Sequence, residues 1–491
     1  MGYLILLILF LLLTWLVYKN FLKSELNGRD LLVGWALKLV YAFTFMYLIS
    51  FVFGDNGKPM GDVGTFLSDS EILKEYGKKD PVGYTKLMFG INADNDQLLA
   101  NELKDTKIWD YGITKDNLND NRLIIRLNSL IHFFSFQNIW VHTLIFAFLS
   151  FIGIILIYRT FSEFVVRKKL FYLALLITPT FAFWGSGITK ETLFVLSFGL
   201  FVFSFKKLLN ELKLVHVLIL TFSIIMLLVN KTHVGLIVIP ISLFVIIHRW
   251  FSFNKKVFAI SGGIILLALI TLSFTPEKIN LVDRLSSKQQ DLINVAKGGV
   301  FFVNDSAFCA FDYDQLDHFD YIEATRKISV NQSTDGEYKL FGEKIFRPFT
   351  IDPDTTEYDV YLVMSPSETF VDVEPINHEP IQLVKNTPIA LLNVLIRPLP
   401  NDNVQHFKYA LFAENLIFCG FLILVLFKQR KIKDEERRWV FFTLVSAILL
   451  ILVIGWSTPI IGAVIRYKMA PQLLLILAAF MLWKTPKKSA Q

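Results

Sequence analysis

The chain alternates long apolar runs with short basic segments and two long polar segments. A run of about 20 apolar residues is long enough to cross a bilayer as a helix. We therefore expect about eleven membrane-spanning helices, several of them shorter than this length. The predicted spans are 3–18, 31–53, 140–158, 170–183, 192–205, 214–229, 235–247, 257–274, 407–427, 440–456 and 470–483. An even number of spans remains open, because residues 387–399 form a further apolar stretch.

The composition agrees with this pattern. Hydrophobic residues make up 54% of the 491-residue chain, and the mean hydropathy is +0.49. Aromatic residues stand at the ends of many apolar runs, as is typical of the membrane–water interface. The expected fold is therefore an all-α polytopic membrane protein with outer-face loops.

Lysine and arginine gather in alternate loops. The loops after the first, third, fifth, seventh, ninth and last predicted spans carry about 22 basic and about 7 acidic residues. Short loops rich in Lys and Arg lie on the cytoplasmic side of a membrane. We therefore expect the N-terminus outside and the C-terminus in the cytoplasm, in a bacterial inner membrane. The net charge of +6 reflects this bias and does not indicate a nucleic-acid partner.

The two long polar segments fall on the outer side in this topology. They divide the chain into an N-terminal transmembrane hairpin (1–53), a first outer loop with amphipathic helices (54–139), a transmembrane core (140–274), an outer insertion domain (275–406) and the C-terminal spans (407–491). In the first loop we expect helices at 69–76, 97–107 and 123–136.

The insertion domain contains a β-like pattern. Residues 338–349 and 357–364 alternate in polarity and are rich in aromatic and β-branched residues, with Asp352-Pro353-Asp354 as a turn signal between them. We expect a β-hairpin or a small sheet there. Residues 389–396 are apolar and are expected to form an interfacial or re-entrant helix.

Residues 183–193 read Phe-Trp-Gly-Ser-Gly-Ile-Thr-Lys-Glu-Thr-Leu and separate two short apolar runs. We expect two short helices to meet there near one membrane surface. A charge at the bilayer centre costs about 2.5–3.5 kcal/mol, so the Lys190-Glu191 pair indicates either a site or a helix start. In the second interpretation Thr189 caps the helix and Glu191 interacts favourably with the helix dipole.

The candidate functional residues are polar groups that the predicted topology brings to the outer side. They are Asp62, Asp69, Lys190, Glu191, Lys231, His233, Arg397, Arg466 and Lys468. Outer short loops of membrane proteins hold few cations, yet these loops each hold one. Because Arg and Lys are the usual phosphate ligands, their shared position predicts an anion-binding site.

Each candidate also has a structural interpretation. In this interpretation Asp62 is an ordinary loop carboxylate, and Arg397 pairs with an acidic residue of a loop. Arg466 and Lys468 resemble cations that extend toward the interface, whereas His233 has the pattern of a structural histidine. The residues do not decide the question singly, but their shared side favours a site.

The motifs of several other enzyme classes are missing from the sequence. There is no Walker-type glycine loop, no His-Glu-x-x-His zinc motif and no Gly-x-Ser-x-Gly elbow. The inner loops are too short for a nucleotide-sugar domain, so a sugar donor would reach the outer face attached to a lipid. Cys309 and Cys419 define no metal or redox motif. We expect no metal and no cofactor, with a divalent cation left open.

Several motifs resemble known membrane enzymes. Gly61-Asp62, soon after an early span, resembles the catalytic Asp position of GT-C glycosyltransferases, which use polyprenyl-phosphate-linked sugars. Residues 179–191, Ile396-Arg397-Pro398 and 462–468 resemble signatures of uncharacterised membrane proteins of bacterial surface-polysaccharide clusters. Thr180 and Gly185 stand where those signatures have serine, and the first loop lacks the adjacent acidic pair of many GT-C enzymes.

The resemblance implies a hexosyl- or pentosyltransferase of polysaccharide biosynthesis in the cell envelope. In it Asp62 would be the general base, Arg466 and Lys468, with Lys190 or Arg397, would bind the donor phosphate, and Lys231 and His233 would line the site. Its partners would be the bilayer, the lipid-linked donor and a glycan or lipid acceptor.

Three alternatives remain open: a polymerase or ligase of lipid-linked oligosaccharides, a flippase or transporter for a lipid-linked glycan, and a purely structural scaffold role. A transporter needs a charged path through the membrane. The inner halves of the predicted spans are almost free of charge, with Lys38 as the exception.

Overall fold

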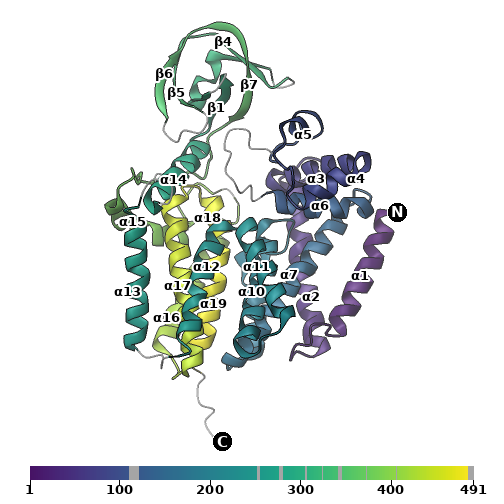
Figure 1. Ribbon diagram of the computed structural model, residues 1–491, viewed down its shortest axis with the longest axis vertical. Coiled ribbons are helices and arrows are strands. Elements are labelled where there is room, and N and C mark those ends of the chain that lie inside the picture. The colour runs from purple at the N-terminus through teal and green to yellow at the C-terminus, as the bar shows by residue number, and fades with distance from the viewer. Residues whose placement is uncertain are drawn as a thin grey trace, which may run out of the picture.

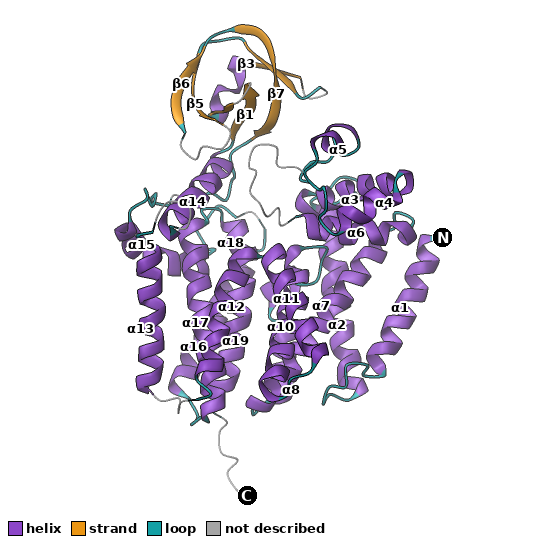
Figure 2. Cartoon of the chain, in the orientation of Figure 1, coloured by secondary structure: helices purple, strands orange, loops and turns teal. Residues whose placement is uncertain are grey.

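The computed structural model describes residues 1–109, 121–250, 255–275, 280–304, 307–322, 325–340, 346–371, 373–404 and 406–484. Within these ranges the chain is mostly helical, and many of its helices run side by side in a bundle (Figure 1). A layer of helices and a β-domain are stacked at one end of the bundle (Figure 2). We call this end, which carries the described residues of the segments 54–109 and 280–404, the distal end, and the opposite one the basic end.

Five helices in the described part of the chain are long and apolar enough to cross a membrane. They are α2 with its π-helical extension (Gly28–Val52), α7 with a 3₁₀ turn (Ile139–Phe164), α10 (Lys190–Asn210), α16 (Lys408–Phe427) and α17 (Asp434–Ser457). The pair α18 (Ile461–Tyr467) and α19 (Met469–Leu482), bent by 41°, makes a sixth if it is one span. These apolar helices are those of a membrane protein, but the predicted number of 11 spans is not confirmed.

Shorter apolar helices complete the bundle. They are α1 (Gly2–Tyr18), α11 (Leu214–Asn230), α12 (Thr232–Ile247) and α13 (Lys255–Leu272). Each runs beside the longer helices (Figure 1). Many of their large apolar side chains are exposed, for example Leu7 and Leu11 of α1 and Leu218 of α11. Such surfaces suit a lipid environment better than water.

The predicted span 170–183 is not one helix. It divides into α8 (Lys168–Ile177) and α9 (Pro179–Trp184). Proline has no N–H to donate and disfavours a helical residue before it, and Thr178 accordingly has an extended ψ of 113°. The helix that follows, α10, has 21 residues. The expected meeting of two short helices is therefore corrected: a broken helix meets a long one.

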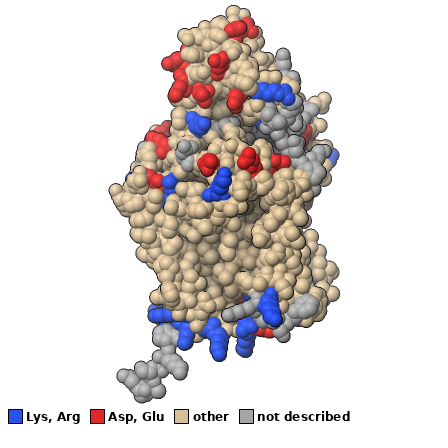
Figure 3. Space-filling model, turned by 90° about the vertical axis from the view of Figure 1, so that its left-hand side faces the viewer, with Lys and Arg blue, Asp and Glu red and all other residues tan. Residues whose placement is uncertain are grey.

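Charged residues gather at the two ends of the bundle and leave a broad uncharged band between them (Figure 3). In this view Lys and Arg predominate at the basic end, whereas Asp and Glu predominate on the β-domain at the distal end. An uncharged band between charged ends is what the hydrocarbon core of a bilayer requires.

A helical layer covers the distal ends of α2 and α7. It consists of α3 (Gly61–Lys79), α4 (Pro81–Met88), α5 (Asp96–Asn101) and α6 (Arg122–Ser135). The amphipathic α6 buries Ile124, Ile125 and Ile131 in a core that it shares with α3. The helix predicted at 123–136 matches α6, and that at 69–76 is part of the longer α3. The helix predicted at 97–107 is too long, because α5 ends at Asn101.

The insertion contains one antiparallel sheet within the described residues. Its strands are β1 (Gly299–Asn304), β2 (Ala307–Phe311), β3 (Phe319–Ile322), β4 (Lys327–Val330), β5 (Thr334–Leu340), β6 (Arg347–Ile351) and β7 (Asp354–Met364), in the order β3-β4-β7-β1-β2-β5-β6. The small sheet is confirmed. The hairpin around Asp352-Pro353-Asp354 is not, because β7 pairs with β1 and β4 and not with β6.

The sheet is strongly curved. Residues 331–333 connect β4 to β5, although β7, β1 and β2 lie between these strands in the sheet. Strand spacings of about 4.8 Å would separate them by about 19 Å in a flat sheet, whereas the connection reaches only about 14 Å. The sheet therefore curls around an aromatic core that contains Phe302, Phe311 and Tyr358 (Figure 1).

The insertion is attached directly to the start of α18. It also contains α14 (Leu281–Lys297) and α15 (Pro380–Leu395), and the predicted interfacial segment 389–396 forms the end of α15. Backbone hydrogen bonds join Val371 N to Pro459 O at 2.7 Å and Ile461 N to Thr369 O at 3.0 Å. These contacts fix the insertion against the helix that carries Arg466.

Candidate functional site

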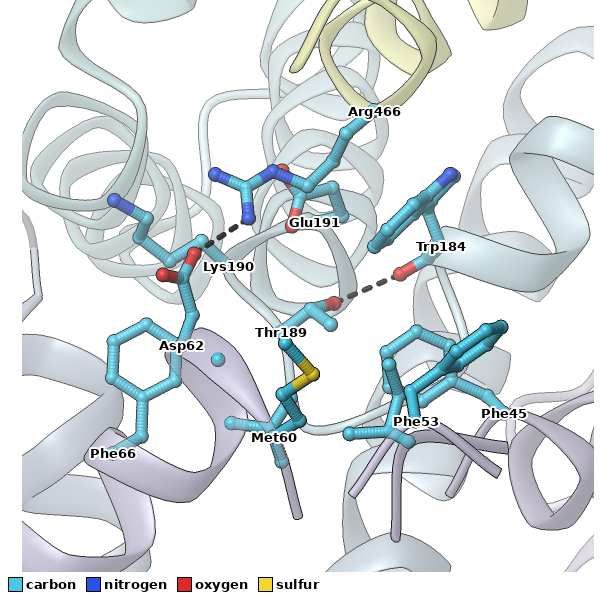
Figure 4. A pocket seen from close by; sticks show the side chains of 13 residues that line it. Phe45, Phe53, Met60, Asp62, Phe66, Trp184, Thr189, Lys190, Glu191 and Arg466 are labelled. Atoms are coloured by element: carbon cyan, nitrogen blue, oxygen red, sulfur yellow. Dashed lines mark hydrogen bonds and ion pairs between the residues drawn. The ribbon is translucent and has the colours of Figure 1, made fainter. Parts of the chain in front are cut away.

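A pocket of about 340 Å³ opens at the distal end of the bundle. Four segments that are distant in sequence form it: the end of α2, the start of α3, the α9–α10 turn and α18 (Figure 4). Its lining residues are Phe45, Ile49, Phe53, Met60, Gly61, Asp62, Val63, Phe66, Trp184, Thr189, Lys190, Glu191 and Arg466. Charged side chains gather on one side and the aromatic rings of Phe45, Phe53 and Trp184 on the other. The pocket thus offers polar and apolar surfaces to one ligand.

Arg466 lies between two carboxylates. Its Nη1 donates to Asp62 Oδ2 at 2.6 Å, and its Nε is 3.4 Å from Glu191 Oε1. Lys231 Nζ donates to the same oxygen of Glu191 at 2.6 Å. The side chains of Glu191 and Lys231 are 2% and 7% exposed, whereas that of Asp62 is 54% exposed. A chain of ion pairs therefore leads from a buried pair to a carboxylate within reach of a ligand.

The local sequence explains why Asp62 and Glu191 stand where they do. Gly61 has a φ of +63°, a conformation that favours glycine, and it lets the chain turn into α3. Thr189 caps α10 by accepting a hydrogen bond from Thr192 N at 3.2 Å, as predicted. Both carboxylates lie in the first turn of a helix, where the helix dipole favours negative charge.

The α9–α10 turn approaches α2 closely. A Cβ on Gly187 would lie 2.2 Å from the Phe45 ring, so a larger residue would push the turn away from the pocket floor. Phe45 also packs edge-on against Phe183 and Trp184, with ring centroids 5.0 and 5.8 Å apart. The aromatic wall of the pocket (Phe45, Phe53 and Trp184) therefore packs directly against the α9–α10 turn that leads to Lys190 and Glu191.

Two of the candidate cations and His233 lie around one tyrosine. Tyr467 has Lys231 Nζ 4.9 Å and the Arg466 guanidinium 5.3 Å from its ring centroid, with the His233 ring centroid at 6.3 Å. Lys190 Nζ donates to Asn121 Oδ1 at 3.0 Å. Of the predicted residues, Asp62, Lys190, Glu191 and Arg466 therefore line the pocket, and Lys231 and His233 support it from behind.

Lys468 and Arg397 belong to a neighbouring polar cluster and do not line the pocket. Lys468 Nζ donates to Asn415 Oδ1 at 2.7 Å, and Asn415 Nδ2 donates to Arg397 O at 2.7 Å. Arg397 Nη1 lies 3.8 Å from Asp402 Oδ1. Arg466 and Lys468 diverge because Arg466 is in α18, whereas Lys468 stands at the 41° bend between α18 and α19.

Asp69 lies outside the pocket and stabilises a loop. Its two carboxylate oxygens accept hydrogen bonds at 2.9–3.1 Å from the backbone N–H groups of Lys107, Ile108 and Trp109. Burial raises the pKa of Asp69 against the lowering effect of these donors. The predicted role as an additional acidic site residue is therefore not supported by its position.

Sequence reasoning missed Glu414, Asn415 and Tyr467. Glu414 is a buried carboxylate inside α16, a helix long and apolar enough to cross a membrane. An ionisable residue within an apolar run is itself a functional signal and could have drawn attention to it. Tyr467 lies within the signature-like segment 462–468, but sequence alone gives no reason for cations to pack on its ring.

Among the residues that the structure describes, no three His, Cys, Asp or Glu side chains are grouped as a metal site would require. Comparisons with protein-family models, with curated proteins and with solved structures found no match. The function of the pocket is therefore inferred from its own chemistry.

Proposed function

We propose that this protein is an integral membrane glycosyltransferase of bacterial surface-polysaccharide biosynthesis. It transfers a sugar from a polyprenyl-phosphate-linked donor to a glycan or lipid acceptor. The pocket at the distal end carries this proposal, because Asp62 and Arg466 face an aromatic wall there. A lipid-linked sugar presents an apolar chain, an anionic phosphate and a sugar ring, and the pocket offers a matching surface for each. The basic loops at the opposite end support an outward-facing pocket.

The donor phosphate binds to Arg466 and Lys190. The guanidinium supplies a bidentate fork and the ammonium a point charge. Glu191 and Lys231 hold the guanidinium in place, since Glu191 is buried between both cations. The sugar ring packs against Trp184 and Phe45, and the lipid chain remains in the bilayer.

Asp62 acts as the general base. Asp62 is bound to Arg466, so the donor phosphate competes for the guanidinium and releases the carboxylate. Asp62 then accepts the proton of the acceptor hydroxyl while the hydroxyl oxygen bonds to the anomeric carbon. The bond from that carbon to the phosphate oxygen breaks, the configuration inverts, and polyprenyl phosphate leaves with the electron pair. Arg466 stabilises the charge on the leaving phosphate.

The test is sugar transfer by purified protein in lipid nanodiscs, supplied with radiolabelled polyprenyl-phosphate sugars and acceptor extract. Asp62→Asn keeps the side-chain shape but cannot accept the proton, so we expect transfer to fall by about 10²–10⁴-fold. Glu75→Gln is the matched control, because Glu75 is also an ion-paired acid on α3 with a side chain 50% exposed. Its transfer rate should stay within about twofold of the wild type.

Near wild-type transfer by Asp62→Asn would remove Asp62 from the base role. Growth of the product by many repeat units would identify a polymerase with the same site. Movement of label between leaflets, with no new glycosidic bond, would support a transporter and contradict the proposal.

A further inference from the structure

The short helix α9 is held at both ends by buried charged side chains that come from membrane-spanning helices. It carries Trp184, which lines the pocket, as its last residue. Glu414 of α16 contacts its beginning, and Lys38 of α2 contacts its end. These residues are 8% and 2% exposed, and charges so deep in an apolar bundle require a reason.

Glu414 accepts a hydrogen bond from a backbone N–H group that the helix break leaves without an intrahelical partner. Its Oε1 accepts a hydrogen bond from Thr180 N at 3.0 Å, and its Oε2 accepts one from the Thr180 hydroxyl at 2.8 Å. Gln472 of α19 also donates to Oε1, at 2.9 Å. The first N–H groups of a helix have no acceptor within the helix. The Glu414 carboxylate supplies an acceptor for Thr180 N, because the helix is broken at Pro179.

Lys38 donates a hydrogen bond to a backbone carbonyl group at the C-terminal end of α9. Its ammonium donates to the carbonyl oxygen of Gly185, the residue after α9, and the Ser150 hydroxyl donates to the same oxygen at 2.6 Å. Lys38 stands near the middle of α2, and Ser150 near the middle of α7. A cation at the end and an anion at the beginning of a helix both match its dipole.

We propose that Glu414 and Lys38 are positioning residues that set the place of Trp184 in the pocket wall through α9. They do not reach the pocket themselves, because neither residue is in its lining. The expectation that this position of Trp184 affects the binding of a lipid phosphate rests on the proposed function. The positioning of Trp184 does not, and it can be measured in the protein alone.

The experiment is ¹⁹F NMR of detergent-solubilised protein labelled with 5-fluorotryptophan. The chain has nine tryptophans, and Trp184→Phe assigns the resonance of Trp184 by its loss. We expect Glu414→Gln and Lys38→Met each to shift or broaden that resonance. Thr180→Val, which removes only the hydroxyl donor, should have a smaller effect of the same kind, and Thr180→Ser should restore the wild-type resonance.

Matched controls lie at the basic end of the bundle. Glu436, 8% exposed, is bound by Arg430, and Lys206, 9% exposed, is bound by Glu163. Glu436→Gln and Lys206→Met also remove buried charges and should leave the Trp184 resonance unchanged. An unchanged resonance in Glu414→Gln and Thr180→Val, or an equal change in the controls, would overturn the proposal.

A ligand titration separates the two proposals. Farnesyl phosphate added to the wild type should move the Trp184 resonance, and Glu414→Gln should weaken its apparent affinity by about tenfold, which corresponds to about 1.4 kcal/mol. If wild-type protein transfers no sugar but Trp184 still responds to Glu414→Gln, the glycosyltransferase proposal fails and the positioning role stands.

Discussion

The pocket and the pair Glu414 and Lys38, here called the α9 clamp, both place charges in apolar surroundings, but these charges have different kinds of partner. In the clamp, Glu414 and Lys38 each bind a backbone group that cannot leave, and Glu414 also accepts hydrogen bonds from the side chains of Thr180 and Gln472. In the pocket, Arg466 is bound to the carboxylates of Asp62 and Glu191, and Asp62 is half exposed. A charge held by the backbone fixes structure, whereas one held by an exposed side chain can exchange its partner for a ligand. The comparison assigns the first cluster to positioning and the second to chemistry.

The largest effect on stability is expected where the pocket cluster is most buried. Lys231→Met leaves the 3.4 Å contact to Arg466 as the ion pair of Glu191 among the described residues, and breaking a buried pair in this way costs about 3–5 kcal/mol. The free energy of unfolding in detergent measures this loss. The double variant Lys231→Met/Glu191→Gln removes both charges and should recover most of it. A single variant within about 1 kcal/mol of the wild type would show that the pair is not buried as described.

A smaller loss is expected in the clamp. Glu414→Gln keeps the shape and one acceptor oxygen but removes the charge, so the bonds from Thr180 weaken. We expect a loss of about 1–3 kcal/mol in the free energy of unfolding. An increase in stability would mean that the carboxylate is an uncompensated charge and does not hold α9.

The smallest effect on stability is expected at the exposed end of the pocket cluster. The Asp62–Arg466 pair is open to solvent on the Asp62 side, and such pairs contribute less than about 1 kcal/mol. Asp62→Asn should therefore unfold almost like the wild type while losing transfer activity. A large loss of stability would instead make Asp62 a structural anchor between α3 and α18.

Much of the site could be predicted from the sequence, because topology alone brings the ends of the spans together. Asp62 and Arg466 are 404 positions apart, yet alternation of basic loops predicted a shared side for them. Topology does not give the direction of a side chain. Lys468 and Arg397 share that side and still point into another cluster, and Asp69 points into its own loop.

The fold was predictable where the signal is local. The apolar runs, the amphipathic α6 and the Thr189 cap all follow from neighbouring residues. The length of the apolar run 170–183 does not predict the break at Pro179, although proline is a local signal for one. The pairing of β7 with β1 and β4 depends on contacts between distant segments and could not be inferred from a turn motif.

The most direct measurement is a structure of the protein in a lipid nanodisc with a polyprenyl-phosphate-linked sugar bound. We predict a phosphate oxygen within about 3 Å of the Arg466 guanidinium, the sugar against Trp184, and Asp62 released from Arg466. A phosphate bound at Lys468 and Arg397, or at the basic end, with the Asp62–Arg466 pair intact, would contradict the proposed site.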